Sequence, residues 1–245
     1  MCGKHNKRGN VERITSGISP DTLALRTIDF VRQQLPAWRD DPHRALEESE
    51  NKLNLQLCKF LDSQARNSFP MVRFDHEEYQ AGQRSIDLSA SLVQTLYLKV
   101  GLYTIYDPIL VLEGKRLPAP SSKREKEYVS GTKPNITTGG IQRFKLGLHG
   151  AKLNLSAMIG YVQDKSAHNW HDKINEWISE LVAGTIVDGC DWNADEILEL
   201  LEEDKVKGVV CYRSVHTRTG NVESSEITLH HLWIAMYHRE TLVGG

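Results

Sequence analysis

The segment Glu113-Gly114-Lys115 carries the first sign of chemistry in the sequence. It ends the mostly apolar run ILVLEGKRL at positions 109–117, which predicts a strand buried on both faces. Residues two apart on a strand share a face, so Glu113 and Lys115 point the same way at the end of this strand. A carboxylate and an ammonium group there can serve a reaction, or they can form a plain ion pair at a strand terminus.

A second carboxylate, Asp87, lies in the segment RSIDLSASL at positions 84–92, where polar and apolar residues alternate as in a half-buried strand. This segment predicts one arm of a hairpin, and a hairpin that precedes the buried strand can bring Asp87 beside Glu113. Two carboxylates, with a backbone carbonyl and water, suit the all-oxygen shell of Mg²⁺. Alternatively, Asp87 belongs to a solvent-facing polar stripe with Ser85 and Ser89.

Glu50 is the least expected residue of a helix predicted over residues 44–66. The apolar residues of this helix recur at helical spacing and make one stripe, formed by Leu46, Leu53, Leu57, Phe60 and Leu61. Glu50 falls on the same stripe, four positions after Leu46 and three before Leu53. A carboxylate on a buried face must be paired, protonated or bound to a cation, because an isolated buried charge is very unfavourable. A structural ion pair with an internal Arg or Lys and a metal site both fit.

An acidic helix, a hairpin that carries Asp87 and a buried strand that ends Glu-Gly-Lys, followed by another helix, resemble the PD-(D/E)xK family of restriction-endonuclease-like nucleases. The resemblance covers residues 44–163. It implies an α/β fold with a restriction-endonuclease-like central mixed β-sheet flanked by helices. It also implies that Glu50, Asp87 and Glu113 are the ligands of one or two Mg²⁺ ions. Lys115 is then the catalytic lysine, which orients the attacking water and stabilises charge.

Polar residues after the predicted strand extend the implied site. Family members carry a glutamine on the next helix, which Gln142 matches, whereas Leu146 stands where an aromatic residue can follow. Ile86 replaces the proline that can precede the first strand acid. Flanking phosphates could be held by the basic side chains of Arg116, Arg143, Lys145, His149 and Lys152. The same side chains also fit an exposed helical face.

The acids and the lysine, with the resemblance that they carry, imply a Mg²⁺-dependent endonuclease that hydrolyses DNA phosphodiester bonds, and the resemblance implies a restriction-like role in bacterial or phage defence. We expect Mn²⁺ to substitute for Mg²⁺, and Ca²⁺ to work poorly because its larger and looser shell misplaces the water. One alternative is a catalytically silent nucleic-acid-binding or assembly subunit with a nuclease fold, although such a subunit usually lacks one of these residues. A ribonuclease is another.

A homodimer is predicted beside DNA as a partner, because one active site cuts only one strand of a duplex. Two sites related by a twofold axis would match the symmetry of the duplex. The contact could come from residues 227–237, ITLHHLWIAMY, or from an amphipathic helix over residues 168–182 that carries Trp170 and Trp177. Both segments also fit the protein core.

The composition is that of an ordinary globular chain, with 245 residues, 40% of them hydrophobic and 25% charged. Its 30 Lys and Arg against 32 Asp and Glu exclude a protein that coats nucleic acid by charge alone, but they allow a local basic groove. No apolar run reaches the roughly 18 residues that cross a bilayer, and the chain does not open with a secretory signal. We therefore expect a cytoplasmic protein without a membrane partner.

Residues 1–20 are polar and rich in Gly and Ser and predict a flexible arm, and residues 21–245 predict a single domain. His230 and His231, in a predicted strand, indicate core or cross-strand hydrogen bonding. The other expected elements are a helix from Asp21 that ends before Pro36, a hairpin of residues 71–80 and 84–92 turned near Ala81-Gly82, a long polar loop over 118–136, a helix that opens at Thr138 or Gly139, and strands at 157–162, 207–215 and 225–237.

Overall fold

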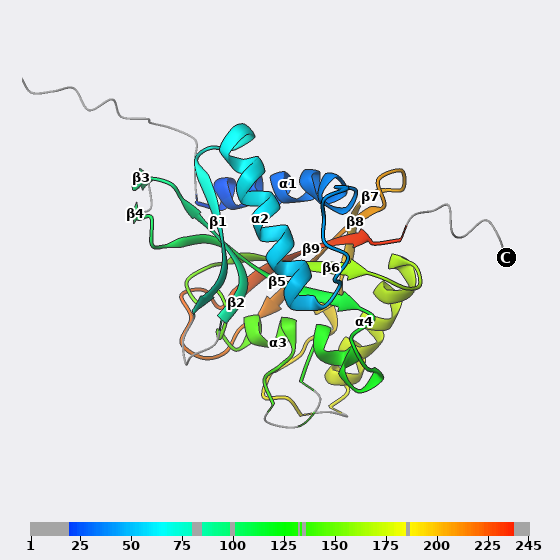
Figure 1. Ribbon diagram of the computed structural model, residues 1–245. Helices are drawn as coiled ribbons and strands as arrows, with labels where there is room; N and C mark the ends of the chain where they lie inside the picture. Colours follow the sequence, from blue (N-terminus) through cyan, green and yellow to red (C-terminus); the bar gives the residue numbers. More distant parts are fainter. Residues whose placement is uncertain are drawn as a thin grey trace, which may run out of the picture.

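The computed structural model describes residues 20–79, 85–98, 101–131, 133, 136–184 and 187–237. Its helices are α1 (Pro20–Arg39), α2 (Glu50–Ser68), α3 (Gly140–Lys145) and α4 (Ala167–Val182), with the short 3₁₀ helices η2 (Ser122–Tyr128) and η3 (Ala194–Glu196) (Figure 1). Its strands are β1 (Val72–Tyr79), β2 (Ser85–Leu92), β3 (Leu96–Leu98), β4 (Gly101–Tyr103), β5 (Pro108–Leu117), β6 (Leu155–Val162), β7 (Glu199–Asp204), β8 (Val209–Thr217) and β9 (Glu226–Ala235). None of the helices in these ranges is long and apolar enough to cross a membrane.

A seven-stranded sheet in the order β1-β2-β5-β6-β9-β8-β7 forms the centre, and β3 and β4 pair separately. The neighbours β5, β6 and β9 run parallel, and every other adjacent pair is antiparallel. Parallel strands in the middle of a sheet need cover on both faces, which explains why all eight residues of β6 are buried. The prediction of an α/β fold with a central mixed sheet is confirmed at this level.

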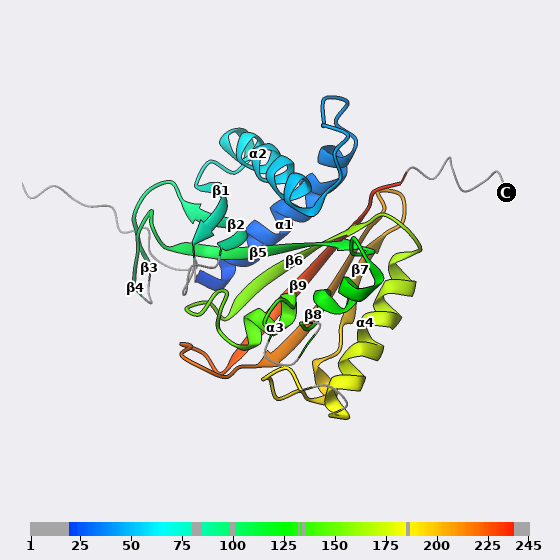
Figure 2. The ribbon, with the colours of Figure 1, turned by 60° about the horizontal axis from the view of Figure 1, so that its bottom comes forward.

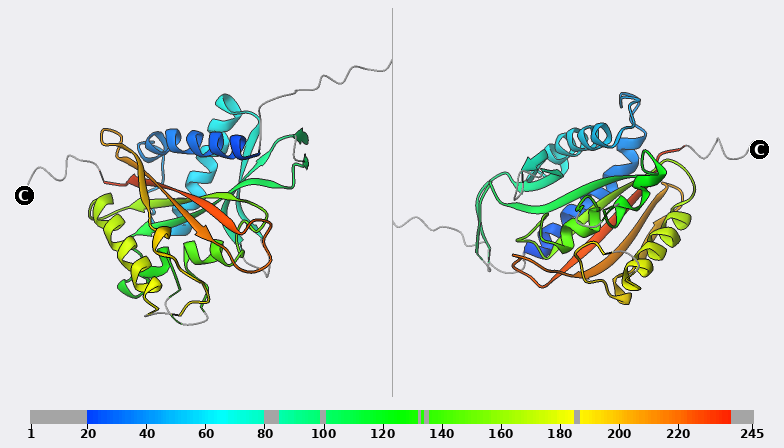
Figure 3. Two further views of the ribbon diagram at one scale, coloured as in Figure 1. Left: turned by 180° about the vertical axis from the view of Figure 1, so that it is seen from behind. Right: turned by 90° about the horizontal axis from the view of Figure 1, so that it is seen from below.

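Two helical layers cover the sheet, with α1 and α2 on one face and α3 and α4 on the other (Figures 2 and 3). The core under α1 and α2 includes Leu35, Trp38 and Leu53. The core under α4 includes Trp170 and Trp177, which are buried, as is Trp233 of β9. The alternative that the two segments belong to the core therefore holds for their tryptophans.

The first helix does not end where proline predicts. α1 continues through Pro36 to Arg39. A proline inside a helix costs a backbone hydrogen bond and strains the preceding turn. Leu35 and Trp38 lie in this last turn and are 0% and 1% exposed. Their burial against the sheet favours the extra turn, so tertiary packing overrides the local signal.

The second helix begins later than predicted, at Glu50 rather than at residue 44. Leu46, which the periodic pattern placed on the buried stripe, is 93% exposed. The buried stripe therefore starts only at Leu53. Glu50 occupies the first turn of the helix, where the helix dipole favours a negative charge.

Other predicted elements have mixed outcomes. The hairpin is present as β1 and β2, although its turn lies outside the described residues, as does most of the arm predicted at 1–20. The polar loop expected at 118–136 instead contains η2. Its last residue, Tyr128, is buried, and the Tyr128 hydroxyl forms hydrogen bonds with Trp233 and His231. The elements confirmed close to their predicted ranges are α3, α4, β5, β6, β8 and β9. The strands β3, β4 and β7 were not predicted, and the acidic sequence ELLEED of β7 is atypical of a strand.

Candidate active site

The candidate site lies where β2 and β5 separate. Their pairing ends at Leu88 and Leu112, while β5 continues to Leu117 against β6. Beyond this point, the backbone N–H groups of β5 that would bond to β2 are left to other acceptors. The N–H of Gly114 donates to Asp87 Oδ2 at 2.8 Å, and the N–H of Arg116 donates to Glu50 Oε2 at 3.2 Å. Two carboxylates therefore satisfy the open edge of the strand that carries Glu113 and Lys115.

Lys115 joins the helix acid to the strand acid. Its Nζ lies 3.0 Å from Glu50 Oε1 and 2.9 Å from Glu113 Oε1. Glu50 is 65 positions away in the chain and is the first residue of α2. The start of this helix therefore lies beside the end of β5 and brings the Glu50 carboxylate to Lys115. The structure thus brings together all four residues that the sequence singled out, and their catalytic and metal-binding roles remain predictions.

Glu113 is the most enclosed member of this group, with 1% of its surface exposed. Its Oε1 also accepts a hydrogen bond from Arg143 Nη1 at 2.8 Å, and Arg143 Nε donates to the carbonyl of Thr137. Its Oε2 lies 3.3 Å from His149 Nδ1. Burial opposes ionisation, but Lys115, His149 and Arg143 together hold the pKa of Glu113 well below its usual range. Glu113 is therefore an anion at neutral pH.

The pKa values of Asp87 and Lys115 both lie above their ordinary values, for different reasons. Burial and the charge of Glu113 raise the pKa of Asp87 to about 7, against the opposing effects of Lys115 and the Gly114 N–H. Burial disfavours the charge of Lys115, but Glu113, Glu50 and Asp87 raise its pKa above the ordinary value. The site therefore combines a fixed ammonium, a fixed carboxylate and a carboxyl group that can change protonation near neutral pH.

Of the predicted phosphate contacts, Arg143 is part of the site and Arg116 is near it. Arg116 takes part through its backbone, while its side-chain Nε donates to Gln163 Oε1 at 2.6 Å. Gln142 is buried and holds backbone groups instead of facing the four residues. Its Oε1 accepts from the N–H groups of Gly131 and Gly139, and its Nε2 donates to the carbonyl of residue 188. In the structure, Gln142 therefore fixes the loop around α3.

Lys145 fits neither of the two sequence interpretations, a phosphate contact or an exposed helical face. It is 1% exposed and pairs with Glu196, with Nζ 2.7 Å from Oε1 and 2.5 Å from Oε2. It is thus neither on an exposed helical face nor open to a phosphate. The partner lies 51 positions away, which explains why the local pattern could not reveal the pair.

A buried polar chain continues from this pair across β8 and β9. It runs through side chains at hydrogen-bonding distances of 2.7 to 3.3 Å, in the order Glu196, His216, Ser214, His231 and Tyr128. Trp233 Nε1 can only donate, and it donates to the Tyr128 hydroxyl at 2.9 Å. The expected core hydrogen bonding of His231 is confirmed. The chain links η3 and η2 to the two neighbouring strands β8 and β9.

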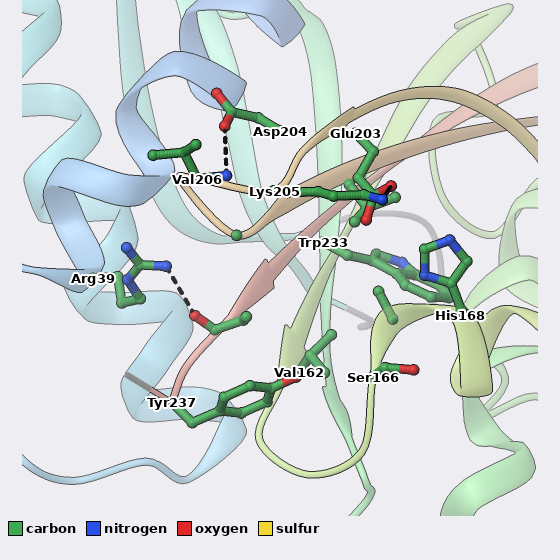
Figure 4. Close-up of a pocket in the computed structure, with 14 residues that line it drawn as sticks. Arg39, Val162, Ser166, His168, Glu203, Asp204, Lys205, Val206, Trp233 and Tyr237 are labelled. Carbon is green, nitrogen blue, oxygen red and sulfur yellow. Dashed lines mark hydrogen bonds and ion pairs between the residues drawn. The ribbon is translucent and has the colours of Figure 1, made fainter. Parts of the chain in front are cut away.

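A cavity of about 270 Å³ lies elsewhere, between the start of α4 and the β7–β8 turn (Figure 4). Its lining includes Ser166, His168, Lys205, Trp233 and Tyr237, and none of the four site residues. Figure 4 shows Arg39 beside it, bonded to the carbonyl of residue 235. The cavity and the candidate site are separate features of the molecule.

Within the described ranges, no three His, Cys, Asp or Glu side chains are arranged, as they stand, to hold a metal ion. At the candidate site, the Lys115 ammonium lies between Glu50 and Glu113. Comparison of the chain with models of protein families, with curated proteins and with solved structures finds no match.

Proposed function

We propose that the protein is a metal-dependent endonuclease of the PD-(D/E)xK type that hydrolyses DNA. The observation that carries the proposal is the meeting of three acids and one lysine, from α2, β2 and β5, at the point where two strands separate. The order of elements, α2, the hairpin β1–β2, β5 and then α3, agrees with the order that the sequence resemblance implies.

The donor set suits a hard divalent cation. Glu50, Asp87 and Glu113 offer only oxygen atoms, as Mg²⁺ prefers. Glu113 Oε2 is buried and accepts no hydrogen bond of good geometry from the described residues, so it keeps an acceptor position that a bound cation could use. A bound Mg²⁺ would neutralise the phosphate and lower the pKa of an attacking water.

The residues of the chain would divide the remaining work. Lys115 keeps its proton because three carboxylates raise its pKa, so it serves as a positive charge and not as a base. A cation held beside Glu113 stabilises the negative charge that builds up on the phosphate in the transition state. Arg143 holds one oxygen of Glu113 through the 2.8 Å bond and thereby fixes how the carboxylate faces the substrate.

A second candidate function has its own support. The same contacts can act as a purely structural clasp, since Asp87 and Glu50 satisfy the free N–H groups of β5 and Lys115 neutralises two acids. A non-catalytic nucleic-acid-binding or assembly subunit would keep such a clasp without turnover.

Incubation of the purified protein with plasmid, single-stranded DNA and RNA tests the proposal. We expect DNA cleavage with Mg²⁺ or Mn²⁺, little cleavage with Ca²⁺, and none in excess chelator. Cleavage of RNA alone would establish the ribonuclease alternative. Nucleic-acid binding without cleavage under every metal condition would favour the non-catalytic subunit.

A further inference from the structure

His149 is enclosed beside the candidate site yet makes no ordinary hydrogen bond with its ring. It is 0% exposed, and the edge of its ring meets Phe144, with ring centroids 5.8 Å apart. The turn that returns it to the sheet depends on Gly147 and Gly150, whose φ angles of +66° and +58° are strained for other residues. The loop that contains these two glycines therefore places the imidazole of His149 next to Glu113.

The contact between His149 and Glu113 has an unusual geometry. Nδ1 lies 3.3 Å from Oε2, and neither ring nitrogen nor Oε2 makes a hydrogen bond of good geometry within the described part of the chain. Buried polar atoms without partners are rare and unfavourable. By contrast, the other oxygen of Glu113 is fully engaged by Lys115 and Arg143. One oxygen of the carboxylate is neutralised by protein cations, and the other faces the ring of His149 without a hydrogen bond of good geometry.

At 3.3 Å the two atoms lie at the long end of hydrogen-bond distances but lack good hydrogen-bond geometry, and the same separation is normal between two ligands of one ion. Ligand atoms about 2.1 Å from a metal stand about 3.0 to 3.4 Å apart when the angle at the metal lies between octahedral and tetrahedral values. Two more buried hydroxyls without hydrogen-bond partners lie on β2 and β6, the strands on either side of β5. Both lie beside Val111, two residues before Glu113. Ser89 is paired with Val111 across β2 and β5, and Ser156 Oγ lies 3.1 Å from the position of a Cβ on Gly150.

We infer that His149 is a metal ligand, which binds a divalent ion together with Glu113 Oε2. The imidazole nitrogen changes the metal preference of the centre. Oxygen-only sites suit Mg²⁺, whereas a mixed nitrogen and oxygen set favours transition-metal ions over Mg²⁺. The inference deepens the proposed function by naming a further ligand and the class of ion, and it rests on that proposal only in sharing Glu113.

Pulsed electron paramagnetic resonance of the wild-type protein loaded with Mn²⁺ tests the inference directly. We expect the ¹⁴N coupling of a bound imidazole, and we expect calorimetry to give an affinity for Mn²⁺ at least about tenfold tighter than for Mg²⁺. His149→Gln should abolish the ¹⁴N coupling and reduce the difference in affinity. The matched control is His168→Gln, an exposed position on α4, which should keep both properties.

The wild-type spectrum decides the question even if His149→Gln does not fold. Bound Mn²⁺ without ¹⁴N coupling, or no bound Mn²⁺, would overturn the inference and leave His149 as a hydrogen-bonding neighbour of Glu113. The result is separate from that of the proposed function. Nitrogen-coupled Mn²⁺ without DNA cleavage would support His149 as a ligand and refute the proposed nuclease activity. DNA cleavage without nitrogen coupling would support the nuclease activity and refute His149 as a ligand.

Discussion

Lys115 is the residue on which the local electrostatics depend, because its ammonium neutralises Glu50 and Glu113 at once. Period-two spacing was sufficient to predict that Glu113 and Lys115 share a face. Glu50 was singled out because it fell on a predicted buried stripe that began at Leu46. Leu46 is in fact exposed, so that start of the stripe was wrong, but the carboxylate of Glu50 does pair with Lys115. The apolar spacing was enough to indicate a carboxylate that needs a partner. It could not predict where the helix begins, because tertiary contacts set that start.

Replacement of Lys115 by Met should destabilise the fold. It removes one of the two cations that contact Oε1 of Glu113, a side chain that is 1% exposed. Removal of one partner of a buried ion pair costs about 3–5 kcal/mol in the free energy of unfolding. Urea unfolding measures this value, and Lys173→Met, which removes an exposed pair with Glu176, should leave it nearly unchanged. A Lys115→Met protein as stable as the wild type would show that the cluster is not held by this charge.

At the scale of elements, the site depends on α2 packing closely over β5. Gly114 allows this approach, since a Cβ at this position would lie 1.9 Å from Asn54 Oδ1. Asn54 is itself buried and accepts a hydrogen bond from the Tyr161 hydroxyl at 2.7 Å. The glycine inside the Glu-x-Lys segment therefore has a packing role. The sequence showed the glycine but could not show which helix crosses it.

Gly114→Ala should lower the free energy of unfolding by at least about 2 kcal/mol, because the added methyl group overpacks the contact with α2. Asn54→Ala should be destabilising on its own, since it leaves the Tyr161 hydroxyl unpaired. The double variant should be more stable than the sum of the two effects, with a coupling of about 1 kcal/mol or more. Strict additivity would mean that the helix does not press on Gly114.

The polar chain through β8 and β9 predicts acid sensitivity. Burial lowers the pKa of His216 and lowers that of His231 well below the ordinary value of 6.5. Below about pH 6.5, these two histidines bind protons in the unfolded chain but not in the folded protein, so their contribution to the free energy of unfolding falls as the pH falls. The slope can reach about 1.4 kcal/mol per pH unit for each histidine. Glu196, whose pKa is lowered to about 2, adds a further loss below about pH 4.5.

Urea unfolding at pH 7.5, 6.5 and 5.5 checks this slope. His231→Gln should be less stable at pH 7.5 and should have a shallower dependence on pH, whereas His168→Gln should keep the wild-type slope. Asp87 acts in the opposite direction over this range, because its raised pKa lets the folded protein bind a proton that the unfolded chain does not, so the comparison of variants decides. A His231→Gln protein with the wild-type dependence on pH would contradict the neutral, buried state of His231. The local sequence did not predict this network, because its members come from η2, η3, β8 and β9.

At the scale of the whole molecule, the sequence predicted the mixed sheet and most of its strands from apolar runs and turns. It did not predict β7, the acidic edge strand, nor the pairing of Lys145 with Glu196, since both depend on neighbours distant in the chain. The two segments expected to form a dimer contact bury their tryptophans in the core. Among the described strands, β1 and β7 are the open edges of the large sheet, and β7 carries the exposed side chains of Leu200 and Leu201.

We still expect a homodimer, because cleavage of both strands of a duplex needs two sites. Light scattering should give twice the mass of the chain, and plasmid should become linear without much accumulation of nicked circles. A monomer that nicks first would contradict this expectation and would indicate an enzyme that is recruited by another subunit.

The most direct test of the nuclease assignment is the rate of plasmid cleavage by Glu113→Gln compared with the wild type in Mg²⁺ and in Mn²⁺. The substitution keeps the shape of the side chain and removes the charge that faces the proposed ion. Glu226→Gln, at the exposed start of β9, is the matched control. We predict that Glu113→Gln loses at least about 100-fold in rate while remaining folded, and that Glu226→Gln cleaves as the wild type does. Folded Glu113→Gln that cleaves at the wild-type rate would contradict the assignment.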